Sequence, residues 1–171
     1  MTQRDGPPSD PREVGRIIGL RLLEAKPRTV GELRDRLCDR GIPQDVADEI
    51  VGRYLEVGLL DDRAYARLWV ESRVRARGLG VAALRRELRG RKVPDDIITE
   101  VLGGLDGEDA RAAAVQRVRG RVSRCRLPLS GKDERRLIAF LMRRGHSTDD
   151  ARIILATAVN QVVDSVGGGG R

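Results

Sequence analysis

The chain has 171 residues, 40% of them apolar and 35% charged, which is enough for one ordinary domain or an array of small ones. Only four residues are aromatic, which argues against a β-sandwich, while the many aliphatic residues exclude wholesale disorder. Basic residues number 33, nearly all arginine, against 26 acidic ones. The resulting net charge of +7 favours a polyanion or an acidic protein surface as the partner.

No segment indicates secretion or insertion into a membrane. The first twelve residues are polar and contain proline, and no apolar run approaches the ~20 residues that span a bilayer. The two cysteines, Cys38 and Cys125, are far apart in the chain and are typical of reduced intracellular thiols, with a single disulfide as the alternative. We therefore expect a soluble cytoplasmic protein that binds no membrane.

An internal repeat is the most informative feature of the sequence. Aliphatic residues at four fixed offsets, with a turn or cap residue at a fifth, occur in three copies at nearly constant spacing. We therefore predict an all-α fold, an elongated and curved array of three tandem three-helix repeats. The five positions in the three copies are Leu33, Leu37, Pro43, Ile50 and Val51; Leu84, Leu88, Pro94, Val101 and Leu102; and Leu137, Leu141, Ser147, Ile154 and Leu155.

Turn and cap residues set the predicted boundaries. In the first copy, Thr29 and Glu32 form a capping box at the start of the second helix. Gly41 ends that helix, and Pro43 opens the third. The predicted segments are a disordered N-terminal segment (1–12), repeat 1 (13–60), repeat 2 (61–105), repeat 3 (106–165) and a flexible glycine-rich tail (166–171).

The start of the second repeat carries four residues with expected structural roles. Asp61 is the predicted N-cap of a helix, which places Leu60 and Tyr65 at the spacing of a hydrophobic staple. Tyr65 and Trp69 lie four positions apart on an apolar helix face. We expect both rings in the core, the alternative being an exposed platform for stacking bases.

Positive charge is concentrated in two stretches of the chain. Arg73–Lys92 contains eight basic residues and one acid, and Arg111–Arg126 contains six basic residues and no acid. Acidic residues gather on the third helices of the first two copies, so we predict separate basic and acidic faces. The alternative is an ordinary solvated helix surface. We predict that Arg85, Arg86 and Arg89 form one ridge with Arg73 and Arg77. The candidate filament- or DNA-binding residues are Arg73, Arg77, Arg85, Arg86, Arg89, Arg117, Arg121 and Arg124.

No catalytic or cofactor site can be assembled from the sequence. With one histidine, no paired thiols and no strand-borne nucleophile motif, neither a metal site nor a catalytic triad is indicated. The histidine, His146, occupies the corner that Ile42 and Val93 fill in the other copies, which predicts a structural plug. We expect no enzyme activity and no cofactor.

A string of spaced residues in the middle of the chain resembles the RecX family, regulators of the RecA recombinase. The resemblance covers roughly residues 14–155 and departs from the family at Lys92, where the family usually has glycine. The residues that carry it are Gly58-Leu59-Leu60-Asp61-Asp62, Tyr65-Ala66, Val70, Arg73, Arg77-Gly78-Leu79-Gly80 and Glu87-Leu88-Arg89.

The resemblance implies a modulator without chemistry of its own that binds RecA–DNA filaments. Such proteins hamper ATP hydrolysis and strand exchange by RecA, and so affect DNA recombination, DNA repair and the SOS response. The implied partners are the RecA filament and, weakly and without sequence preference, single- and double-stranded DNA, bound in a salt-dependent way by a monomer. The alternatives are a nucleic-acid-binding helical repeat that acts without RecA, a scaffold for another acidic protein, and an enzyme.

Overall fold

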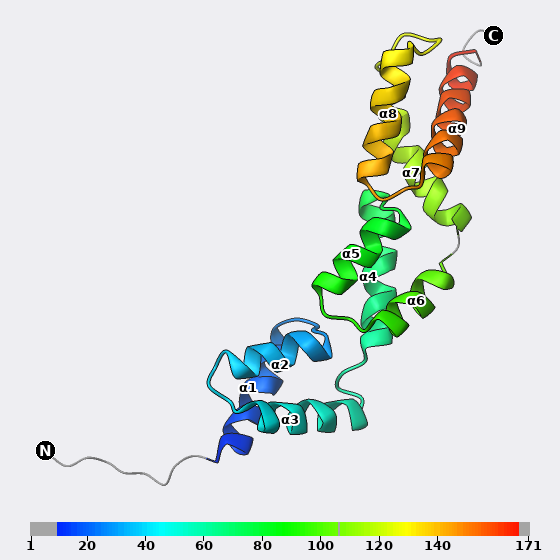
Figure 1. Cartoon of the computed structure of the whole chain (residues 1–171). Helices are drawn as coiled ribbons and strands as arrows, with labels where there is room; N and C mark the ends of the chain where they lie inside the picture. The colour runs from blue at the N-terminus through cyan, green and yellow to red at the C-terminus, as the bar shows by residue number, and fades with distance from the viewer. Residues whose placement is uncertain (1–9, 106, 168–171) are drawn as a thin grey trace, which may run out of the picture.

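The computed structural model describes residues 10–105 and 107–167, and that part of the chain forms nine α-helices and no strand. The helices form three groups of three that follow one another in an elongated, bent body, with α1 at one end and α9 at the other (Figure 1). This confirms the predicted all-α array of three tandem repeats. The helices are α1 (Pro11–Ala25), α2 (Val30–Cys38), α3 (Gln44–Glu56), α4 (Asp62–Arg77), α5 (Val81–Gly90), α6 (Asp95–Gly103), α7 (Gly107–Val122), α8 (Gly131–Arg143) and α9 (Thr148–Gly167).

Both ends of the array differ from the predicted limits. Helix α1 begins inside the segment predicted as disordered, because the Asp10 side chain accepts a hydrogen bond from the backbone N–H of Arg12 and caps the helix. Helix α9 continues to Gly167, inside the predicted tail. The rest of those two segments, residues 1–9 and 168–171, lies outside the described residues.

Each repeat has a hydrophobic core of its own. The six leucines of the second helices, at equivalent positions in the three copies, are at most 2% exposed. They are the buried face of short amphipathic helices, which are stable only when that face is packed. These leucines are Leu33, Leu37, Leu84, Leu88, Leu137 and Leu141.

Local capping signals in the sequence produce the helix ends. The Thr29 hydroxyl accepts from the backbone N–H of Glu32, and the Glu32 carboxylate accepts from the N–H of Thr29, which confirms the capping box. Asp61 accepts from the N–H of Ala64 at 2.9 Å and so caps α4, as predicted. Gly41 adopts a φ of 81°, a conformation that favours glycine, at the turn after α2.

The predicted staple between Leu60 and Tyr65 is wrong. The backbone N–H of Leu60 donates to the carbonyl of Tyr54, which holds Leu60 over the end of α3 and buries it in the first core. Tyr65 instead packs against the second core, as does Trp69. Both rings are half-buried and line a groove, so the prediction that they belong to the core holds only in part.

Successive repeats meet through a recurring contact. The corner after the second helix of one repeat lies against the start of the second helix of the repeat before it. At the first joint, the Thr29 hydroxyl donates to the carbonyl of Arg91 at 2.6 Å. At the second, the N–H of Gly80 donates to the carbonyl of Arg144 at 2.8 Å. Thr29 and Gly80 occupy equivalent places in their repeats, as do Arg91 and Arg144, so the two joints follow one plan.

The second joint contains an additional helix-to-helix contact. Helix α7 contacts α4, and Gly78 at the end of α4 lies so close to α7 that a Cβ there would be 3.1 Å from Cα of Ala114. His146, 9% exposed, fills the corner as predicted, and its Nε2 lies 3.0 Å from the carbonyl oxygen of Gly78. Helices α1 and α4 make no comparable contact at the first joint.

Candidate functional site

Four arginines gather where the second and third repeats meet, and we call Arg77, Arg117, Arg121 and Arg144 the joint arginine cluster. Arg77 ends α4, Arg117 and Arg121 project from α7, and Arg144 follows α8. The Arg144 guanidinium donates to the carbonyl of Arg77 at 2.5 Å, and Arg117 donates to the carbonyl of Ala76. These carbonyls belong to the last turn of α4, where the helix dipole favours positive charge.

An aromatic ring holds two members of this cluster in place. The guanidinium carbons of Arg121 and Arg144 lie 4.1 Å and 4.5 Å from the centre of the Phe140 ring. Such cation–π contacts contribute about 0.5–1 kcal/mol each at exposed sites and restrict the long arginine side chains. The cluster is therefore positioned by carbonyls and a ring.

The joint arginine cluster carries more positive charge than its surroundings neutralise. Burial holds the pKa of Arg144 below its ordinary value, and the charges of Arg117, Arg121 and Arg77 lower that pKa further. Within the described residues, Arg77 has Glu87 at 3.6 Å, while Arg117 and Arg121 pair with no carboxylate. Phosphate or carboxylate oxygens from a partner would relieve this repulsion.

A second basic group lies in an open groove of about 760 Å³ between α5, α7 and the start of α9. Arg85, Arg86 and Arg89 of α5 line it. Arg89 pairs with Asp95 at 2.7 Å, which holds the pKa of that carboxyl below its usual range. Arg85 donates to the Thr99 hydroxyl at 3.4 Å. This group is thus more nearly neutralised than the joint arginine cluster.

The five arginines predicted to form one ridge are divided between two surfaces. Arg73 and Arg77 both face Glu87, at 2.9 Å and 3.6 Å, and neither lines the groove that holds Arg85, Arg86 and Arg89. Glu87 of α5 pairs with the first set and does not line that groove. Arg124 is exposed just after α7, and the structure pairs it with no carboxylate in the described part of the chain.

Sequence reasoning missed Arg144, the most buried member of the joint arginine cluster. A signal was available, because an arginine precedes the corner in every repeat, as Arg40, Arg91 and Arg144. Its role depends on the following repeat being docked on the preceding one, which no single repeat shows.

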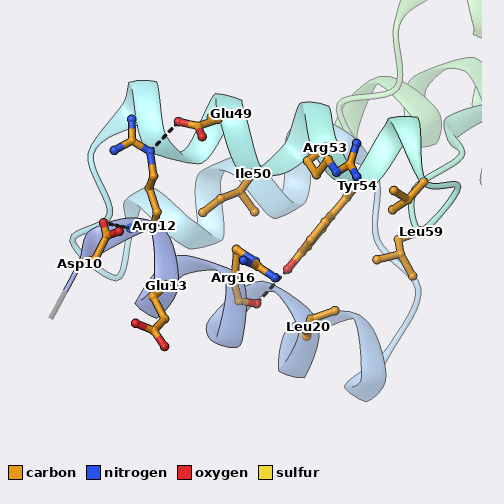
Figure 2. A pocket seen from close by; sticks show the side chains of 11 residues that line it. Asp10, Arg12, Glu13, Arg16, Leu20, Glu49, Ile50, Arg53, Tyr54 and Leu59 are labelled. Atoms are coloured by element: carbon orange, nitrogen blue, oxygen red, sulfur yellow. Dashed lines mark hydrogen bonds and ion pairs between the residues drawn. The ribbon is translucent and has the colours of Figure 1, made fainter.

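Arginines of neighbouring helices neutralise most of the acidic residues on α3 and α6. In the first repeat, Arg12 of α1 pairs with Glu49 at 2.8 Å (Figure 2), and Arg34 of α2 pairs with Asp48. In the second, Arg63 of α4 pairs with Glu100 at 2.8 Å. These pairs are half-exposed and so contribute little to stability. They pair carboxylates of α3 and α6 with arginines of the same repeat.

The described ranges contain no group of three histidine, cysteine, aspartate or glutamate side chains that could hold a metal ion. None of the helices in them is long and apolar enough to cross a membrane. What the surface offers a ligand is guanidinium groups, which donate in pairs to phosphate or carboxylate oxygens.

Comparisons with known proteins agree on one family. The family description "RecX, first three-helix domain" matches residues 16–53, and "RecX, second three-helix domain" matches residues 61–102. The chain is 42% identical over 152 residues to Regulatory protein RecX of Mycobacterium tuberculosis (strain H37Rv), which covers 85% of this chain and 87% of that protein. It is 39% identical over 159 residues to Regulatory protein RecX of Streptomyces lividans, covering 93% and 85%. A crystal structure of RecX from Lactobacillus salivarius superposes with a TM-score of 0.77 at 20% identity, covering 88% of this chain and 98% of that one.

Proposed function

This chain belongs to the RecX family of regulatory proteins, and on that premise we propose that it binds RecA filaments on DNA and restrains their ATP hydrolysis and strand exchange. It acts as a binding modulator in DNA repair and the SOS response, as a monomer in the cytoplasm, and without catalysis or a cofactor. Any contact with DNA is weak, independent of sequence and sensitive to salt.

The joint arginine cluster is the observation that carries this proposal. Arg117 and Arg121 are exposed and have no carboxylate partner among the described residues, while the end of α4 holds Arg117 and Phe140 holds Arg121. A preorganised set of guanidinium groups suits a polyanion or an acidic protein surface. A filament of protein on DNA presents both.

The elongated shape supports a polymeric partner. Three repeats in line (Figure 1) can touch several successive positions along a helical filament, whereas a compact domain of the same length touches one or two. Several weak contacts made at once give a higher overall affinity than each contact gives alone.

The test is the DNA-dependent ATPase of the RecA protein from the same organism, titrated with this protein. We expect inhibition when the protein is present at a small fraction of the RecA concentration, since filament binding acts on many subunits. A RecA-independent DNA binder would inhibit only at concentrations that coat the DNA. Inhibition confined to those concentrations, and abolished by adding more DNA, would contradict the proposal and favour the simple nucleic-acid binder.

A further inference from the structure

An open groove of about 640 Å³ separates the first repeat from the second. Its walls are the end of α1, the turn before α4 and the outer face of α4. Two large apolar side chains in it are exposed to solvent, Leu59 at 50% and Leu68 at 67%. We call this the first-joint groove.

The groove is open because of the side chains on α4. Helices α4 and α7 are equivalent elements of successive repeats, and their buried residues correspond in order: Ala66, Val70 and Val74 of α4 to Ala114, Val118 and Val122 of α7. By this correspondence, α7 has Ala113 at the position where α4 has Tyr65. At the second joint, the alanines of α7 allow it to lie directly on Gly78. At the first joint, the rings of Tyr65 and Trp69 line the groove together with the end of α1.

The Trp69 ring already has its stacking partners. The guanidinium carbons of Arg73 and Arg91 lie 3.9 Å and 4.3 Å from the ring centre, and the Tyr65 ring is stacked beside it at 5.9 Å. Its Nε1 donates to the Glu87 carboxylate at 3.0 Å. With two guanidinium groups within 4.3 Å of its centre and a tyrosine ring stacked beside it, the Trp69 ring is already engaged, and a nucleobase would have to displace one of these groups to stack on it. This argues against nucleic acid as the occupant.

The rim of the groove is positively charged. Lys26 and Arg28 stand at the end of α1, and neither pairs with a carboxylate in the described ranges. Asp61 is the single acid in the lining, and one of its carboxylate oxygens accepts the hydrogen bond that caps α4. An occupant must therefore offer negative charge to the rim and apolar surface to Leu59 and Leu68.

We propose that the first-joint groove binds a protein segment in which acidic residues flank one or two large apolar side chains. The apolar side chains rest on Leu59 and Leu68, and the carboxylates reach Lys26 and Arg28. Because the walls come from two repeats, the bound segment bridges them and restrains the angle between them. This inference does not rest on the proposed function, because neither RecA nor DNA enters it.

Trp69, the sole tryptophan of the chain, reports directly on the groove. The probe is a capped synthetic peptide of about twelve residues with two phenylalanines among glutamates, titrated into the full-length protein while tryptophan emission is recorded. We expect a saturable change in emission. Two matched peptides, one with glutamine for glutamate and one with serine for phenylalanine, should bind at least tenfold more weakly. An oligo-dT strand of similar length should produce no saturable change in emission.

Two variants locate the binding. Leu68→Ser removes exposed apolar surface, and its control is Val163→Ser, a residue of α9 that is 51% exposed. Lys26→Glu reverses the rim charge, and its control is Lys132→Glu on α8. We expect each groove variant to weaken the acidic peptide at least tenfold, each control to leave it unchanged, and all four to keep the wild-type circular dichroism. The inference is overturned if the peptide causes no change in emission, if the uncharged peptide binds equally well, or if the controls lose as much affinity as the groove variants.

Discussion

A Cβ atom added to Gly80 would lie 2.4 Å from the carbonyl oxygen of Gly145, so two backbones touch at the second joint. The N–H of Ala82 donates to that same carbonyl at 3.2 Å, beside the hydrogen bond from the N–H of Gly80 to the carbonyl of Arg144. A side chain at position 80 cannot fit without separating the repeats.

We therefore predict that Gly80→Ala lowers the free energy of unfolding by about 1–3 kcal/mol, the usual cost of overpacking. Urea unfolding followed by circular dichroism measures it. The control is Gly120→Ala inside α7, where a Cβ would meet nothing within 4 Å. That change should stabilise the protein by about 0.5–1 kcal/mol, because alanine is the better helix former. Equal effects of the two changes would mean that the joint is not packed as described.

Thr29 stabilises both the start of α2 and the joint between the first two repeats. Its side chain caps α2 and donates to the Arg91 carbonyl, and the residue is fully buried. Thr29→Ala removes both interactions and should cost about 2 kcal/mol in thermal or urea unfolding. Thr29→Ser keeps the hydroxyl and should restore most of that loss. If serine proves as damaging as alanine, the methyl group and not the hydroxyl is what matters.

The pH dependence of stability should reveal Asp62. Burial raises the pKa of this carboxyl, although the N–H of Val30, which donates to it at 2.9 Å, lowers that pKa in part. The folded state then holds the Asp62 proton more tightly than the unfolded state. The contribution of Asp62 to the unfolding free energy is thus most favourable below the ordinary carboxyl pKa of about 4 and falls as pH rises through the raised value.

Asp62→Asn removes this titration while keeping an acceptor for Val30. Relative to wild type, the variant should gain stability as the pH is raised from about 3.5 to 7.5, as measured by urea unfolding at each pH. A wild type that gains on the variant over that range would show that the hydrogen bond outweighs burial.

The two basic groups should differ in DNA binding. Replacing Arg117 and Arg121 with glutamine removes cations that have no carboxylate partner among the described residues. Replacing Arg85, Arg86 and Arg89 removes cations of which one already pairs with Asp95. Each contact to a single-strand phosphate contributes about −0.7 to the slope of log K against log salt, so the double variant should flatten the slope by up to about 1.4.

Fluorescence anisotropy of a labelled oligo-dT strand, between low and moderate salt, gives this slope. The α5 triple variant should change it less. If the triple variant has the larger effect, the groove between α5 and α9 is the DNA contact. Unchanged slopes in both would assign the arginines to a protein partner or to solvent.

The outline of the molecule should be extended in solution. A compact globule of 171 residues has a radius of gyration of roughly 15–16 Å. Small-angle scattering should give a clearly larger value, since the three repeats follow one another in line (Figure 1). A value at the compact limit would mean that the repeats fold back on each other.

Helices and their ends were predictable because their determinants are local. Leucine periodicity and the caps at Thr29 and Asp61 act within four residues, and each is found where the sequence indicates it. The core into which Leu60 packs was not predictable, since a residue between two repeats can join either one. Only the turn of the chain at Tyr54 decides it.

The joints and the joint arginine cluster depend on residues far apart in the sequence. Arg144 reaches the carbonyl of Arg77, 67 positions away, and the split of the predicted ridge follows from where Glu87 faces. Charge density along the chain indicated only where arginines are concentrated. It held no information on which guanidinium groups are neutralised within the fold, and that distinction separates the two basic surfaces.

Each joint is made from different parts of the two repeats that it links, so the array has a direction and its two ends differ. A Cβ on Gly145 would lie 2.3 Å from the backbone nitrogen of Ala83, but a Cβ on Gly41, the equivalent corner of the first repeat, would meet nothing within 4 Å. Within the described part of the chain, that corner is not covered by another repeat, unlike its counterpart at the second joint. Duplication of a whole repeat at either end would leave both existing joints intact. Each joint therefore depends only on the two repeats that it links.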